Sequence, residues 1–162
     1  MPVSSSIERL QPCLFDRLID EAPEQKLESR TQRIVSMSRY REGVLRDVVW
    51  LLNCSAHTDD EGLGEFPEVE KSVFNFGKHG LTGLVASSLE PDELEREIVR
   101  AIRQFEPRVV PGTLSVRAVE DKTAASPNVM SFEISGELWA QPFPEKLFIK
   151  TALDMENGTI VT

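Results

Sequence analysis

The tetrapeptide Phe105-Glu106-Pro107-Arg108 marks the boundary between a helical half and a strand-forming half of this chain. Before it, an amphipathic helix is predicted over Pro91–Phe105, and after it apolar residues recur at every second position. Pro107 disfavours the α conformation at Glu106, so the helix is expected to end there. The Glu106 carboxylate would then lie at a helix C-terminus, where the macrodipole disfavours an anion by about 0.3–1 kcal/mol. We therefore expect Glu106 and Arg108 to have assigned partners, the alternative being two solvated charges after a helix stop.

Three further helices are predicted before this one from apolar residues at helical spacing. The best defined covers Met37–Asn53, with Asn53 as a plausible C-cap and Val48 and Leu52 in the core, and a short amphipathic helix is expected within residues 12–20. Another is expected to begin at Pro67, which suits the first position of a helix. The apolar stripe of the longest helix is Met37, Tyr40, Val44, Leu45, Val48, Leu51 and Leu52, and the apolar side of the helix at Pro67 is Val69, Val73, Phe74 and Phe76.

Apolar and polar residues alternate after the junction, which is typical of strands with one buried face. Such strands are usually antiparallel, and Asn157-Gly158 is a strong signal for a hairpin that returns a last short strand over residues 159–162. Helices followed by strands predict an α+β fold, with N-terminal amphipathic helices followed by a small antiparallel β-sheet. The alternating positions are Leu114, Val116 and Ala118, then Met130, Phe132, Ile134 and Leu138, then Leu147, Ile149, Thr151, Leu153 and Met155.

The length of 162 residues suggests a single α+β domain over residues 36–162, preceded by an N-terminal arm over residues 1–35 that carries the short helix. The net charge of −9 argues against nucleic acid or an anionic membrane as a main partner, and no apolar run approaches the roughly 20 residues that span a bilayer. The first residues lack the pattern of a signal peptide, which predicts a cytoplasmic protein. Cys13 and Cys54 are interpreted as small buried or half-buried residues in a reducing compartment.

No catalytic residue, metal ligand or cofactor site is predicted. The acidic residues between Cys54 and Glu70 are typical of a solvated loop, because a glycosidase needs a carboxylate pair at a set separation with one member buried. His57 and His79 are the only histidines and match no ligand pattern, so His57 is interpreted as a loop histidine. Trp50 and Trp139 are too few for a base-stacking platform and are expected to be anchors in the core or in an interface.

Five segments are informative in combination. They are Leu14-Phe15-Asp16-Arg17-Leu18, Tyr40-Arg41-Glu42-Gly43-Val44-Leu45-Arg46-Asp47-Val48-Val49-Trp50-Leu51-Leu52-Asn53, Phe66-Pro67-Glu68-Val69-Glu70-Lys71-Ser72-Val73-Phe74-Asn75-Phe76-Gly77, Leu81-Thr82-Gly83 and Phe105-Glu106-Pro107-Arg108. In this order they resemble the TssE family, the baseplate wedge subunits of the bacterial type VI secretion system. That family is related to the wedge subunits of contractile phage tails and has long been labelled lysozyme-like. The resemblance covers about residues 14–155.

The resemblance implies a structural protein rather than an enzyme. Members of the family lie in the baseplate with TssF, TssG and TssK, and their β half resembles the interlocking domain of the sheath proteins TssB and TssC. They join the wedge to the contractile sheath and seed its polymerisation by strand pairing. Glu106, Pro107 and Arg108 match a Glu-Pro-Arg motif that contacts the helical bundle of the wedge partner, so the counter-charge of Glu106 is expected on another chain.

Two further groups of residues are expected to bind partners. Leu14, Phe15 and Leu18 belong to a short apolar helix that could dock onto another chain or pack back on its own domain. Ile149, Thr151 and Leu153 lie in the strands expected to border the edge that meets the sheath, although the last hairpin could instead merely complete the domain's own sheet. The alternative function is a lysozyme-like glycosidase that cleaves peptidoglycan, but no carboxylate pair supports it and a cytoplasmic protein cannot reach the cell wall alone.

Overall fold

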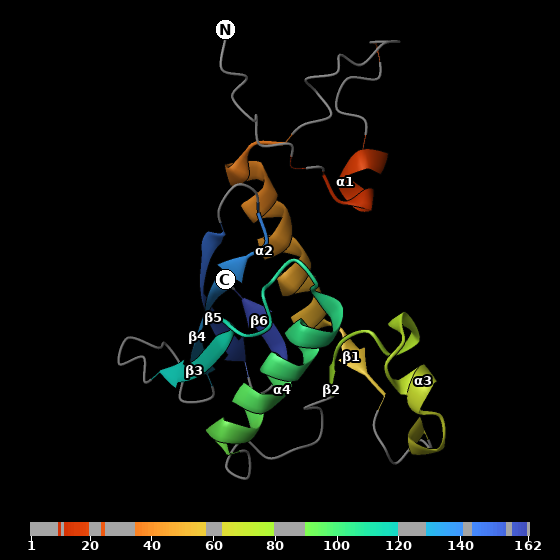
Figure 1. Cartoon of the computed structure of the whole chain (residues 1–162). Coiled ribbons are helices and arrows are strands. Elements are labelled where there is room, and N and C mark those ends of the chain that lie inside the picture. Colours follow the sequence, from red (N-terminus) through yellow and green to blue (C-terminus); the bar gives the residue numbers. More distant parts are fainter. Residues whose placement is uncertain are drawn as a thin grey trace, which may run out of the picture.

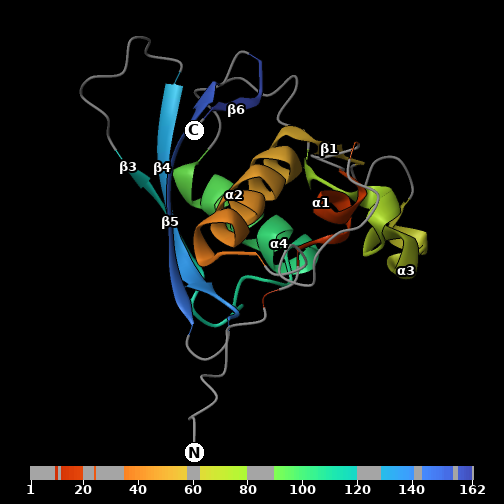
Figure 2. The same cartoon turned by 90° about the horizontal axis from the view of Figure 1, so that it is seen from above.

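Two helices lie across one face of a four-stranded antiparallel sheet, so the predicted α+β fold is confirmed (Figure 1, Figure 2). This computed structural model describes residues 10, 12–19, 24, 35–57, 63–79, 90–119, 129–140, 144–154 and 157–161. The two helices are α2 (Met37–Asn53) and α4 (Pro91–Phe105). The strands are β3 (Ser115–Val119), β4 (Val129–Leu138), β5 (Glu145–Asp154) and β6 (Thr159–Val161), and they follow the order β3-β4-β5-β6.

Local sequence signals explain where the two long helices begin and end. The Ser36 side chain accepts a hydrogen bond from the Arg39 backbone N–H and caps the N-terminus of α2. Pro91 occupies the first turn of α4, and Glu106 is its C-cap, as Pro107 predicts. Asn53, predicted to be the C-cap of α2, is instead its last residue, and Cys54 is the C-cap. Cys54 is exposed, whereas the sequence predicted a buried or half-buried residue.

The core lies between these helices and the inner face of the sheet. Val48 and Leu52 are each 1% exposed, so their predicted burial is confirmed. Phe132 and Ile134 of β4 are fully enclosed below the helices. The buried core residues are Leu10, Tyr40, Val44, Val48, Leu51, Leu52, Leu94, Ile98, Ala101, Ile102, Val109, Leu114, Val116, Phe132, Ile134, Leu138, Ala140, Leu147, Ile149, Leu153 and Ile160.

Smaller elements lie on the side of the helices away from the sheet (Figure 2). They are the helix α1 (Leu14–Leu18), the 3₁₀ turns η2 (Leu63–Glu65) and η3 (Val73–Asn75), the helix α3 (Pro67–Glu70) and the strands β1 (Ser55–Ala56) and β2 (Lys78–His79). The parallel pairing of β1 with β2 was not predicted. It requires Gly77, at φ 139°, because a Cβ there would lie 2.5 Å from the Cys54 carbonyl oxygen.

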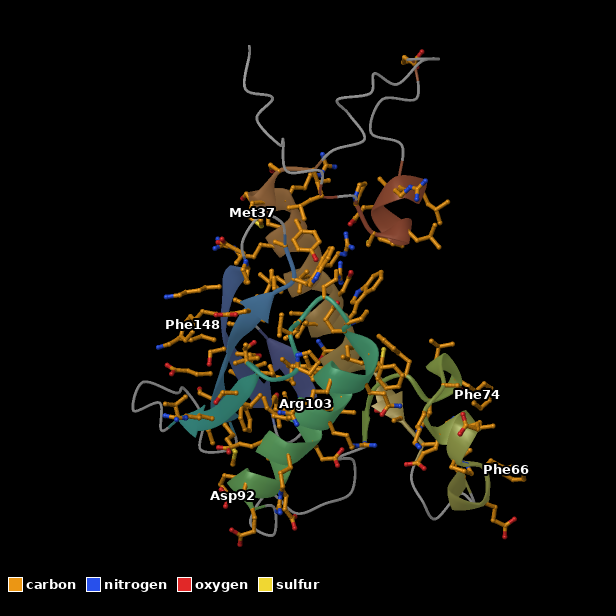
Figure 3. All side chains as sticks on the ribbon, in the orientation of Figure 1. Met37, Phe66, Phe74, Asp92, Arg103 and Phe148 are labelled. Carbon is orange, nitrogen blue, oxygen red and sulfur yellow. The ribbon has the colours of Figure 1, made fainter. Side chains whose placement is uncertain are left out.

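The region around α3 departs from the sequence prediction. A helix with an apolar side was expected from Pro67, yet α3 is one turn long and Val73 is 83% exposed. Phe66 and Phe74 point away from the rest of the molecule (Figure 3). Asn75, 3% exposed, holds the segment instead, since its side chain accepts from the His57 N–H at 2.7 Å and donates to the Glu70 carbonyl.

Some sequence predictions lie outside the described residues. They include most of the polar stretch at residues 21–33 and the Leu81-Thr82-Gly83 turn. Within the described part of the chain, no helix has the length and apolar character needed to span a membrane.

Candidate functional site

The Glu-Pro-Arg junction is a buried ion-pair site rather than an exposed one. Glu106 is 4% exposed, and its Oε1 accepts hydrogen bonds from the Arg108 Nε at 2.6 Å and from the Arg108 backbone N–H at 3.1 Å. The second carboxylate oxygen, Oε2, is paired with Nη2 of the same guanidinium. Glu106 therefore has its counter-charge within its own chain, which corrects the expectation that another chain supplies it.

The ion pairs continue from this junction to the N-terminal helix. Arg108 Nη2 donates to Asp47 Oδ2 at 2.6 Å, and the other oxygen of Asp47 is 2.8 Å from Nη2 of Arg46. Arg46 in turn pairs through Nη1 with Asp16 of α1. We call this series, Glu106–Arg108–Asp47–Arg46–Asp16, the ionic chain; it connects α4, α2 and α1.

The charges in the ionic chain stabilise one another. The pKa of Asp16 is lowered, mainly because its carboxylate accepts a hydrogen bond from Arg46. Burial alone would raise this pKa, and a hydrogen bond from the Cys13 thiol lowers it further. Burial lowers the pKa of Arg108, but its hydrogen bonds and charge interactions with Glu106 and Asp47 outweigh burial and raise it overall. Both shifts favour the charged forms of Asp16 and Arg108 at neutral pH, as an ion-pair chain requires.

Helix α1 rests on α2 through Phe15 and Asp16. The Phe15 ring meets the Trp50 ring edge-to-face at 5.3 Å, and the Arg46 guanidinium lies 4.9 Å from the centre of the Phe15 ring. Gly43 leaves room for this contact, since a Cβ there would lie 3.2 Å from Asp16 Oδ2. The arm helix thus packs on its own domain, one of the two outcomes expected from its sequence.

Docking of α1 leaves most of its apolar surface uncovered. Leu14 is 71% and Leu18 75% exposed, while Phe15 and Trp50 are about half exposed. Trp139 is also largely exposed, so both tryptophans lie at the surface rather than in the core. Large apolar side chains beside a buried ion-pair site are typical of a protein–protein interface.

The side chains of the predicted site residues of β5 face inwards. Ile149, Thr151 and Leu153 are at most 4% exposed, and their side chains fill the core. The alternation that assigns them to the inner face assigns Lys146, Phe148 and Lys150 to the outer face, and these three side chains are exposed. The alternation in the sequence therefore indicates both the inward-facing and the outward-facing residues of β5.

Among the described residues, the edge of β5 that faces β6 is unpaired over more than half of its length. Strand β6 pairs there only with Ala152, Leu153 and Asp154. The backbone N–H and C=O of Ile160 bind the Asn53 side chain instead of β5, so the Ile160–Leu153 pair is not hydrogen-bonded across the strands. Even-numbered residues of β5 therefore direct their backbone groups towards the β6 side, and at residues 146, 148 and 150 no described strand meets them.

The two outermost strands of the sheet are capped by helix side chains. On β3, Glu95 Oε1 of α4 accepts the Ala118 N–H at 2.7 Å. On β6, the Asn53 amide of α2 accepts the Ile160 N–H at 2.7 Å and donates to its carbonyl at 3.0 Å, as a neighbouring strand would. The segment of β5 from Lys146 to Lys150, which we call the open edge, carries no such cap from any described residue.

The described part of the chain contains no group of three or more His, Cys, Asp or Glu side chains that could hold a metal ion. The His57 ring is stacked against Phe74, with 6.0 Å between ring centres. Glu65 and Glu68 are exposed to solvent, whereas the general acid of a glycosidase normally lies in a partly buried site.

Comparison with known proteins identifies a family for this chain. The family model described as "Baseplate wedge protein gp25" matches residues 38–143, which is more than half of the chain and spans α2, α4, the Glu-Pro-Arg junction, β3 and β4. No curated protein and no solved structure matched the chain. The chain therefore belongs to the family of the baseplate wedge protein gp25.

Proposed function

We propose that the chain is a structural subunit of the baseplate of a bacterial type VI secretion system, where it joins the wedge to the contractile sheath. Family membership supports the role in a baseplate. The observation that carries the specific role is the open edge of β5, because an uncapped strand edge pairs readily with a strand of another protein. The protein acts in the cytoplasm by binding alone, without catalysis or a cofactor.

The wedge is proposed to bind the face that carries α1 and the Glu-Pro-Arg junction. Pro107 is exposed above the buried Glu106, and Leu14 and Leu18 present apolar surface from the other end of the ionic chain. The partners proposed for this face are TssF and TssG, with TssK in the same assembly. Apolar anchors supply the binding energy in such an interface, and the ionic chain holds them in position.

The sheath is proposed to pair its strands with the open edge. Phe148 is 60% exposed and points away from the helices, between the exposed Lys146 and Lys150 (Figure 3). A strand of TssB or TssC at this edge would form hydrogen bonds with backbone groups that no described residue binds. Further rings of sheath would then assemble on the first ring. Lysines at a strand edge disfavour indiscriminate pairing, which makes the edge selective for its partner.

Reconstitution tests this proposal. Phe148→Pro removes the backbone donor at the middle of the open edge, while Phe148→Ala removes the side chain and keeps the donor. When either variant is co-expressed with TssF, TssG and TssK, we expect both to co-purify with the wedge. When TssB and TssC are added, sheath assembly seen by electron microscopy should start from Phe148→Ala baseplates and fail with Phe148→Pro. Sheath that grows normally from folded Phe148→Pro baseplates would contradict the proposal.

A further inference from the structure

A groove lies between α4 and β3. Strand β3 is at the opposite end of the strand order from β6, and so on the other side of the sheet from the open edge of β5 (Figure 1). Its volume is about 550 Å³, within the range of ligand-binding clefts. The residues that matter for its chemistry are Arg96, Arg100 and Arg103 on α4, with Val99 and Val116 as the apolar part of the lining.

The groove concentrates positive charge in a strongly acidic chain. Arg96, Arg100 and Arg103 are spaced four and three residues apart, which places them on one face of α4. Arginines in this part of a helix complement the helix dipole, but the dipole does not require them to gather around one cavity. An anionic ligand fits this surface better than a cationic or neutral one.

The arginines have unused hydrogen-bonding capacity. Arg100 binds Glu97 through Nη2 at 2.9 Å, yet its buried Nε has no hydrogen-bond partner among the described residues. Arg103 is exposed and forms no ion pair or hydrogen bond with any described residue. The Arg96 Nε is engaged by the Asp92 carbonyl at 3.1 Å. A carboxylate entering the groove would meet the guanidinium groups of Arg100 and Arg103.

The opposite wall of the groove is a strand edge. Because Glu95 on α4 accepts the Ala118 N–H, the backbone groups of Ala118 face the helix rather than β4. The residue two positions earlier on the same strand, Val116, directs its backbone groups to the same side. Glu95 thus occupies one position that a pairing strand would take, while the position at Val116 stays available, which limits pairing to a short segment.

We propose that this groove binds a short, acidic, extended segment of a partner protein. Carboxylates of the segment bind Arg100 and Arg103, an apolar side chain lies between Val99 and Val116, and the backbone pairs with Val116. Charge complementarity selects the occupant, because a basic or uncharged segment would provide no counter-charge for the arginines. This site is separate from both surfaces of the proposed function and does not depend on it.

Fluorescence anisotropy of the full chain at low salt tests the site. The probe is a fluorescein-labelled hexapeptide, Asp-Glu-Val-Glu-Val-Asp, and the matched probe replaces every carboxylate by its amide. We expect saturable binding of the acidic probe, and binding at least about tenfold weaker for the amide probe and for Arg100→Gln/Arg103→Gln, because two charge-assisted contacts are lost. The control Arg117→Gln, an exposed arginine on the outer face of β3, should bind within about twofold of the unmodified chain.

Three outcomes would overturn the proposal. The first is no saturable binding of the acidic probe, and the second is equal binding by Arg103→Gln, a single change at an exposed position that leaves the fold intact even if the double variant misfolds. The third is complete displacement of the probe by millimolar succinate, which would show that the groove takes a small dicarboxylate rather than a peptide. Retained peptide binding in succinate supports the extended segment.

Discussion

At the scale of single residues, the Glu-Pro-Arg motif serves the fold before it serves assembly. Glu106 lies at the helix end that the macrodipole makes unfavourable for an anion. Arg108, two residues later, offsets the unfavourable dipole by donating hydrogen bonds to the Glu106 carboxylate from its side chain and its backbone. Its guanidinium also donates to Asp47. The motif is therefore compact because Pro107 turns the chain so that Arg108 folds back over Glu106.

Arg108→Ala should lower the free energy of unfolding by about 3 kcal/mol, because it leaves the buried Glu106 carboxylate without its partner. Urea denaturation at pH 7 measures the change, with Arg103→Ala, an exposed arginine of α4, as the control. If the junction were exposed and its charges solvated, the alternative that the sequence left open, the loss would stay below about 1 kcal/mol. A loss that small would contradict the buried ion-pair site.

Docking of α1 should weaken in acid because Asp16 takes part in it. Arg46 lowers the pKa of Asp16 in the folded chain, so the stabilisation is complete above the ordinary value of 3.8 and is lost as the pH falls through the lowered pKa. Trp50 fluorescence, followed in a Trp139→Phe background, should therefore change below pH 4 before far-ultraviolet circular dichroism does. Asp16→Asn should lack this transition, and a transition of equal size in that variant would contradict the role given to Asp16.

At the scale of elements, the sequence predicted the long helices and strands and the short elements α1 and β6, but not the contacts between distant residues. The stripe of α2, the end of α4 at Glu106 and the alternation of β4 and β5 each rest on many residues, so the pattern is unambiguous. The pairing of Arg108 with Asp47 joins residues 61 positions apart, and no local pattern encodes it. The exposure of Val73 and Phe74 was not predicted, because the spacing of apolar residues indicates which of them share one face of a helix but not whether that face is buried.

Asn53→Ala should destabilise the fold by about 2 kcal/mol, since the Asn53 amide makes two hydrogen bonds to Ile160 and each contributes about 1 kcal/mol. Thermal unfolding measures the loss. Asn53→Asp keeps the acceptor for the Ile160 N–H and should lose less, and Ser38→Ala, at an exposed position of α2, should change little. Equal effects of Asn53→Ala and Ser38→Ala would show that the cap on β6 contributes nothing.

Leu52→Ala should cost about 2–5 kcal/mol, because it opens a cavity in the centre of the core beneath α2. Leu18→Ala is the matched control: the same chemical change at a side chain that is 75% exposed should alter stability by less than about 0.5 kcal/mol. Both values come from urea denaturation. A Leu52→Ala variant as stable as Leu18→Ala would mean that the apolar stripe of α2 does not face the core.

At the scale of the whole molecule, each outermost strand of the sheet carries one cap from a helix side chain, and the edge of β5 beside β6 is partly uncovered among the described residues. Glu95 caps β3 at Ala118 and Asn53 caps β6 at Ile160, while β6 reaches only Ala152–Asp154 of β5. Ala152 and Asp154 pair with Val161 and Thr159 of β6, so proline there would disturb the domain's own hairpin. The position that tests the edge is Phe148.

Photo-crosslinking from position 148 tests most directly whether this edge joins the baseplate to the sheath. p-Benzoylphenylalanine in place of Phe148 keeps an exposed aromatic side chain beside the open edge. After irradiation of assembled baseplates with attached sheath, we predict a covalent adduct with TssB or TssC, identified by mass spectrometry. The same label at Arg117, on the outer face of β3, should give none. An adduct with the sheath from position 117 and none from position 148 would contradict the account.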